Sequence, residues 1–175
     1  SRRGVHFTGF TLKWYQGLFQ DPRVLEYFAN TLVVALVSTL VSTVLGTLLA
    51  LGLVRYRFPG NGFLRYLLPV VVPDVVMGVS LLLLFAFSRE LLGFPRLSLL
   101  TVILGHITFQ VAFVTLVVRS RLLLLDPALE EAARDLGARG FQTFLHVTLP
   151  LAWPGVAAGA LLALTLSLDD FVVTF

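Results

Sequence analysis

The chain has 175 residues, of which 57% are hydrophobic and only 13% are charged, with a formal net charge of +3 and no cysteine. Its mean hydropathy of +0.91 is far above that of a soluble domain, whose surface must be polar. This composition predicts a membrane protein without a large soluble domain, and the lack of cysteine excludes disulfides and thiolate metal sites. The positive charge comes almost wholly from arginines spread over several loops, so it indicates membrane topology rather than nucleic-acid binding.

Residues 1–29 are polar and aromatic, and they lack the apolar core of a signal peptide. Tryptophan and tyrosine side chains suit the membrane interface, where one side of the ring is wet and the other dry. We therefore expect an extracytoplasmic, partly helical lead-in segment. The first residues are thus neither a signal peptide nor a span, and the last residues, LTLSLDDFVVTF, lie in another apolar run. We therefore expect both ends to be cuts through a longer protein.

Four apolar segments are long enough to cross about 30 Å of hydrocarbon as helices. They are residues 30–54, 66–88, 97–118 and about 151–175. The first is uncharged throughout, whereas the second is interrupted near its start by Pro69, Pro73 and Asp74. The chain is thus predicted to be an all-α, polytopic transmembrane bundle.

The loop charges predict the orientation of these spans, because arginine and lysine near span ends favour the cytoplasm. Seven basic residues fall on the side of the loops at 55–65 and 119–150, against six on the other side. Leaving out Arg2 and Arg3, which lie far from any span, makes the comparison seven against four. We expect the loop 119–150 to be cytoplasmic and the N-terminal segment to lie outside.

The most polar stretch of the chain, residues 125–155, is predicted to contain a short helix. Asp126 can cap it, Pro127 can be its first residue, and Gly137 can end it. The helix would carry a narrow apolar face of Leu129, Ala132, Ala133 and Leu136, opposite Glu130, Glu131, Arg134 and Asp135.

The two alanines at the centre of that face would let another surface approach closely, which suits docking into a groove. An ordinary interfacial loop helix is the alternative on physical grounds alone. Pro150 is expected to end this polar segment, because proline breaks the helical hydrogen-bond pattern where the next span begins.

A longer pattern runs through this loop: Glu131-Ala132-Ala133, three residues, Gly137, nine residues, then Val147-Thr148-Leu149-Pro150. It resembles the EAA loop of permease subunits in bacterial ABC importers, usually written E-A-A, three residues, G, nine residues, I-x-L-P. Val147 replaces the usual isoleucine. The resemblance implies a type I permease fold over about residues 27–175, with five or six core helices of which the last is missing here.

The resemblance also implies that the loop forms a coupling helix that sits in a cleft on a separate ATPase subunit. The residues implied to couple to that subunit are Glu131, Ala132, Ala133, Gly137, Leu149 and Pro150. The sequence contains no G-x-x-x-x-G-K-[ST] phosphate loop, and its only lysine is Lys13. We therefore expect ATP and magnesium to be bound by the ATPase, and this chain to be neither an enzyme nor a cofactor-binding protein.

The implied partners are ABC ATPase subunits, a second permease subunit that is identical or different, an extracytoplasmic solute-binding protein and the lipid bilayer, with no nucleic acid. The implied location is the bacterial plasma (inner) membrane, as a multi-pass protein.

Ionisable residues within spans are costly and often mark a solute pathway, which singles out Asp74, Asp169 and Asp170. LTLSLDDFVVTF, and VVVPDVVMGVSLLLLF around Asp74, resemble spermidine/putrescine-type permeases, although many relatives carry glutamate at Asp74. The resemblance implies a polyamine, a polycation whose ammonium groups carboxylates could pair with. The alternatives are that these acids cap or end their helices, that the importer carries an amino-acid-like solute, iron or an oxyanion, or that the chain is a secondary transporter.

The remaining polar residues of the spans predict packing rather than chemistry. His106 and Gln110, four residues apart, are expected to face the interior and to hydrogen-bond to a neighbouring helix, and no metal site is predicted. Gly155 and Gly159 make a small face suited to close helix packing. An intramembrane enzyme using Asp74, Asp169 and His106 has no recognisable catalytic spacing in its favour.

Overall fold

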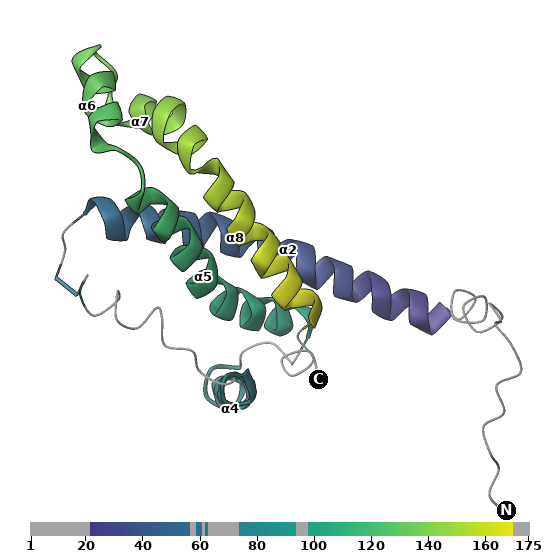
Figure 1. Cartoon of the computed structure of the whole chain (residues 1–175). Coiled ribbons are helices and arrows are strands. Elements are labelled where there is room, and N and C mark those ends of the chain that lie inside the picture. The colour runs from purple at the N-terminus through teal and green to yellow at the C-terminus, as the bar shows by residue number, and fades with distance from the viewer. Residues whose placement is uncertain (1–21, 57–58, 61, 63–73, 94–97, 170–175) are drawn as a thin grey trace, which may run out of the picture.

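The computed structural model describes residues 22–56, 59–60, 62, 74–93 and 98–169. Its elements in chain order are α2 (Pro22–Arg55), α4 (Asp74–Leu92), α5 (Leu99–Leu123), α6 (Pro127–Asp135), α7 (Gly140–Thr143), the π-helix η1 (Phe144–Thr148) and α8 (Leu149–Asp169). Figure 1 shows α2, α5 and α8 crossing one another, with α6 and α7 projecting beyond them at one end.

Helix α2 contains the whole predicted span 30–54 and begins earlier, at Pro22. Proline suits the first turn of a helix because its missing N–H has no intrahelical partner there in any case. The last residues assigned to the lead-in, 22–29, are therefore the first turns of α2, whereas residues 1–21 lie outside the described part. The helix ends at Arg55, a cation placed where the helix dipole favours positive charge.

Three helical runs among the described residues are long and apolar enough to cross a membrane: Pro22–Arg55, Leu99–Leu123 and Gly140–Asp169. They confirm the predicted all-α, multi-span class and contain most of the first, third and fourth predicted spans. The second predicted span, 66–88, starts outside the described residues. Helix α4 begins within it at Asp74 and continues to Leu92, followed by Gly93 at a φ of +64°, and it is not among the three.

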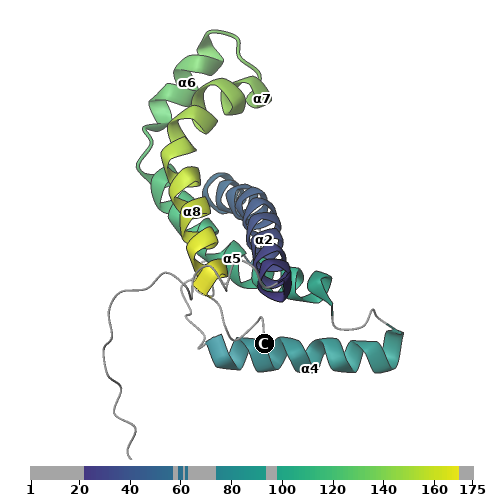
Figure 2. The same ribbon diagram turned by 90° about the vertical axis from the view of Figure 1, so that its right-hand side faces the viewer.

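Helices α2, α5 and α8 pack against one another around a core of small and branched apolar side chains. The buried members include Ala50, Val114, Val118, Ala152 and Val156. Gly46 of α2 faces α5 so closely that an added Cβ would lie 2.7 Å from the Cβ of Val114. Helix α4 contacts α5 only lightly, and Figures 1 and 2 show it below the other three helices, outside the bundle that they form.

Polar side chains in the middle of this bundle join its three helices. The Ser42 hydroxyl donates to Gln110 Oε1 at 2.9 Å, and Gln110 Nε2 donates to the carbonyl of Ala163 at 3.2 Å. His106 Nδ1 lies 2.9 Å from the hydroxyl of Ser167. The prediction that His106 and Gln110 face the interior and bond to neighbouring helices is confirmed.

The glycine prediction for α8 is also confirmed. A Cβ on Gly155 would lie 2.5 Å from the Cβ of Arg121 on α5, and one on Gly159 would lie 3.4 Å from Val114 Cγ1. The two glycines therefore let α8 approach α5 closely, as small residues do between membrane helices.

The prediction that Pro150 ends the polar segment is wrong, because α7, η1 and α8 form one continuous helical run from Gly140 to Asp169. A proline inside an α-helix cannot donate a hydrogen bond, and its ring crowds the carbonyl four residues earlier. The turn before Pro150 is a π-helix, in which the Leu149 N–H donates to the Phe144 carbonyl, five residues back. This wider turn lets the chain stay helical through the proline.

Candidate functional site

The short helix predicted in the polar loop is present as α6, with the predicted ends. It starts at Pro127, and the Asp126 carboxylate accepts a hydrogen bond of 2.9 Å from the amide of Ala128. It ends before Gly137, whose φ of +88° is favourable only for glycine. The amide of Ala138 then donates to the Ala133 carbonyl at 3.0 Å, which satisfies an end group of the helix.

The alanine-centred face of α6 is not covered by the described part of the chain. No residue of α6 is buried; Leu129 is 47% exposed and Leu136 is 90% exposed. Ala132 is exposed and Ala133 is half-buried between them. Helix α6 therefore presents a row of apolar side chains at the projecting end of the bundle (Figure 1), where a second surface can reach it.

The two glutamates of α6 point to different surroundings, although the sequence placed both on one polar face. Glu131 is exposed, whereas Glu130 is half-buried and forms an ion pair with Arg55 at the end of α2. Glu130 Oε1 also accepts a hydrogen bond of 2.8 Å from the hydroxyl of Thr148 in η1. No spacing rule in the sequence could have found this contact, because its members come from three separate elements.

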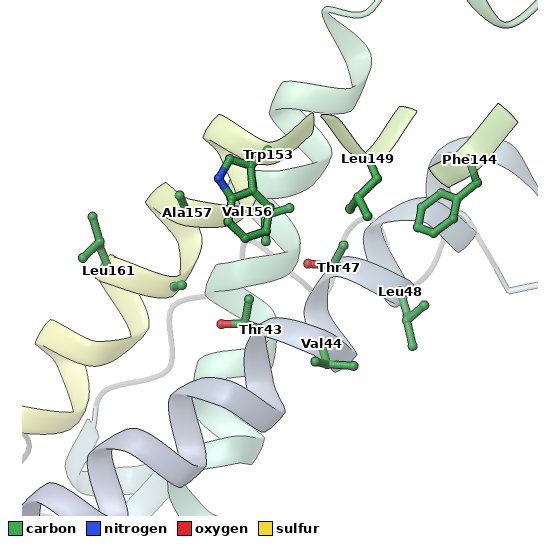
Figure 3. A pocket seen from close by; sticks show the side chains of 11 residues that line it. Thr43, Val44, Thr47, Leu48, Phe144, Leu149, Trp153, Val156, Ala157 and Leu161 are labelled. Carbon is green, nitrogen blue, oxygen red and sulfur yellow. The ribbon is translucent and has the colours of Figure 1, made fainter. Parts of the chain in front are cut away.

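Leu149 and Pro150, the last predicted members of the coupling loop, are the first two residues of α8. Pro150 is exposed, whereas Leu149 is half-buried. Leu149 lines an apolar groove of about 620 Å³ between α2 and α8, together with Thr43, Thr47 and Trp153 (Figure 3). The predicted coupling residues therefore do not form one patch, because α6 carries the exposed alanine-centred face while Leu149 lies in the groove between α2 and α8.

The three acids predicted to line a solute pathway are not brought together by the described structure. Asp169 is exposed at the last residue of α8, which has 21 residues and so ends about 30 Å from the coupling loop. Asp74 is the first residue of α4, but its side chain lies outside the described part, as does all of Asp170. Their role stays a prediction.

Within the described residues, no group of three or more His, Cys, Asp or Glu side chains is arranged to hold a metal ion. His106 is buried and bonded to Ser167. This histidine thus serves a contact between α5 and α8.

A model of the family described as "Binding-protein-dependent transport system inner membrane component" matches residues 22–174. The chain is 44% identical to the spermidine/putrescine transport system permease protein PotC of Escherichia coli K12 over 176 residues, which is 99% of this chain and 65% of that protein. It is 40% identical to the putrescine transport system permease protein PotI of the same strain, over 95% of this chain and 61% of that protein.

A PotC of Haemophilus influenzae is 38% identical over 99% of this chain and 66% of its own length. The chain thus spans slightly less than two thirds of the length of these relatives. The matches confirm the resemblance that was predicted from the loop pattern and from the sequence around Asp74 and Asp169.

Proposed function

Because the chain belongs to the family of binding-protein-dependent transport system inner membrane components, we propose that it is the permease subunit of an ATP-driven importer. It forms half of a translocation pathway and moves a polyamine such as spermidine or putrescine inward by alternating access. The chain itself performs no covalent chemistry.

The observation that carries this proposal is the uncovered apolar face of α6 at the end of the bundle. An amphipathic helix with small residues at its centre binds well in a groove, because its backbone can approach the partner closely. The partner is an ABC ATPase, which binds ATP and magnesium and moves α6 when its two copies close. Exposed Glu131 is available there to pair with a basic group of the ATPase.

The other partners follow from the architecture of such an importer. A second permease subunit, identical or different, supplies the other half of the pathway, and an extracytoplasmic solute-binding protein delivers the solute. Contacts with the second permease are expected on helices such as α4, whose described side chains are largely exposed.

A polyamine is favoured by two findings that are independent of the coupling loop. The matched relatives PotC and PotI are named for spermidine and putrescine transport. Asp169 is an exposed carboxylate at the end of α8 farthest from α6, where a solute from outside would first meet the spans. Adjacent carboxylates at 169 and 170 would attract a polycation through Coulomb attraction at short range.

The test is uptake of labelled spermidine into vesicles that contain the full-length protein assembled with its ATPase, second permease and binding protein. We expect uptake to require ATP and the double variant Asp169→Asn/Asp170→Asn to lose roughly tenfold or more, the cost of about one charge-pair interaction. Glu26→Gln is the matched control, because Glu26 is an exposed acid at the same end of the bundle.

Uptake that continues without ATP under a proton or sodium gradient would contradict the importer and favour a secondary transporter. Normal uptake by the double variant, in a complex that still contains the ATPase, would remove the two acids from the pathway.

A further inference from the structure

Three polar side chains from three separate elements meet where α6 joins the spans. Arg55 is the last residue of α2, Glu130 lies in α6, and Thr148 is the last residue of η1. Arg55 Nη2 donates both to Glu130 Oε1 and to the Thr148 hydroxyl, the latter at 2.5 Å. The Thr148 hydroxyl in turn donates to Glu130 Oε1 at 2.8 Å. We call these three residues the anchor cluster.

The anchor cluster is partly shielded from water, unlike the guanidinium of Arg134, which also lies near Glu130. Thr148 is 1% exposed, and the side chains of Arg55 and Glu130 are 27% and 22% exposed. Arg134, which lies 3.7 Å from the other oxygen of Glu130, is 60% exposed. Hydrogen bonds to ionised groups are stronger than neutral ones, and burial reduces the competition from water. We therefore expect the contact of Glu130 with Arg55 to be stronger than its contact with Arg134.

Helix α6 needs such a contact, because no residue of α6 is buried and apolar packing does not fix its orientation. Through the chain, α6 is joined to α5 by residues 124–126 and to α7 by residues 136–139. The anchor cluster adds links from α6 to α2 and, through Thr148, to the start of α8. All three membrane-spanning runs are thereby connected to the short helix outside them.

We propose that the anchor cluster is the joint through which movement of α6 reaches α2 and α8. Arg55, Glu130 and Thr148 are positioning residues: they do not touch the solute or the nucleotide, but they keep α6 and two spans moving as one body. This inference rests on the proposed function of α6 as the helix that a separate ATPase drives. The widened π-turn that ends at Thr148 places the third member of the joint directly before α8.

The test compares Glu130→Gln, Arg55→Gln and the double variant in vesicles that hold the complete transporter, with polyamine uptake and ATP hydrolysis measured together. We expect each variant to assemble and to hydrolyse ATP, while uptake per ATP falls roughly tenfold, the size expected of one charge-assisted contact. In the double variant, uptake per ATP should be no lower than in either single variant, because all three variants remove the same contact. Glu26→Gln, at the opposite end of α2, is the control and should keep the wild-type ratio.

A wild-type ratio of uptake to hydrolysis in both single variants would overturn the joint, as would an equal fall in uptake and hydrolysis in an assembled complex. Should the charge variants fail to assemble, Thr148→Val decides, because it keeps the shape of this buried side chain and removes only its hydroxyl. It should lower the ratio, whereas Thr148→Ser should restore it.

A second measurement separates this inference from the proposed function. Deuterium exchange of residues 127–135 can be followed in the full-length protein without any solute or nucleotide. Faster exchange in Glu130→Gln than in the wild type and in Glu26→Gln supports the anchor cluster even if the transporter moves another solute. Unchanged exchange contradicts it, even if polyamine uptake is normal.

Discussion

Gly46 and Gly52 lie on the same helix, α2, but only Gly46 meets another span. A Cβ at Gly46 would lie 2.7 Å from Val114 Cβ and 3.1 Å from the Val111 carbonyl oxygen, whereas nothing lies within 4 Å of a Cβ at Gly52. We expect Gly46→Ala to destabilise the protein by about 1–3 kcal/mol, because α2 and α5 must move apart. Gly52→Ala should be neutral or stabilising by about 0.5–1 kcal/mol, because alanine favours the helix.

Thermal unfolding of the two variants in detergent measures this difference directly. Equal unfolding temperatures for Gly46→Ala and Gly52→Ala would contradict the close approach of α2 and α5 at Gly46 and Val114.

The sequence predicted which side chains of the spans need partners, but not which partners they find. His106 and Gln110 were expected to bond to a neighbouring helix because an unsatisfied polar group is costly in a membrane. That Gln110 reaches both Ser42 and Ala163 depends on the rotation of three helices, which no local pattern encodes. Gly46 was missed for the same reason, whereas Gly155 and Gly159 were found because their four-residue spacing marks a helix face.

At the scale of elements, the sequence predicted helix ends correctly where the capping residues act within a single turn. Asp126, Pro127 and Gly137 define the ends of α6, because a cap or a positive φ depends only on the local backbone. The helix break expected at Pro150 was wrong, because the helical run continues through this residue from Gly140 to Asp169. A π-turn that accommodates a proline depends on a hydrogen bond five residues back, which the residue types do not reveal.

Gly137 offers a test of how tightly the end of α6 is defined. At a φ of +88°, Gly137→Ala should cost about 1–2 kcal/mol locally and change the direction of the chain after α6. We expect uptake per ATP to fall while the complex still assembles, since the misdirected helix follows the ATPase poorly. Gly140→Ala is the matched control, because Gly140 has neither a positive φ nor an atom within 4 Å of an added Cβ.

The prediction for Gly137 is checked by measuring spermidine uptake and phosphate release in the same vesicles. An equal ratio in the two alanine variants would mean that the left-handed turn is not needed for coupling.

At the scale of the whole molecule, composition and periodicity predicted a helical membrane bundle with a polar loop outside it, and three spanning helical runs confirm that class. Composition and periodicity could not predict the contact between Arg55 and Glu130, which are 75 residues apart and which connect α6 to the end of α2. Helix α6 has no buried residue, yet this contact holds it to the spans. A force applied to α6 is therefore passed to the spans instead of only bending α6 away from them.

That mechanical view predicts where the ATPase contacts the chain. Because the chain has no cysteine of its own, single cysteines can be placed at Leu136, 90% exposed on the α6 face, and at Leu168, 52% exposed near the far end of α8. A short bifunctional cross-linker should join the cysteine at position 136 to the nucleotide-hydrolysing subunit of the intact complex, and the yield should change when ATP binds. The cysteine at position 168 should capture none of that subunit, because a membrane-spanning length of about 30 Å separates it from α6. Capture of the ATPase at 168 but not at 136 would place the motor at the opposite end of the bundle, and α6 would then be an ordinary loop helix.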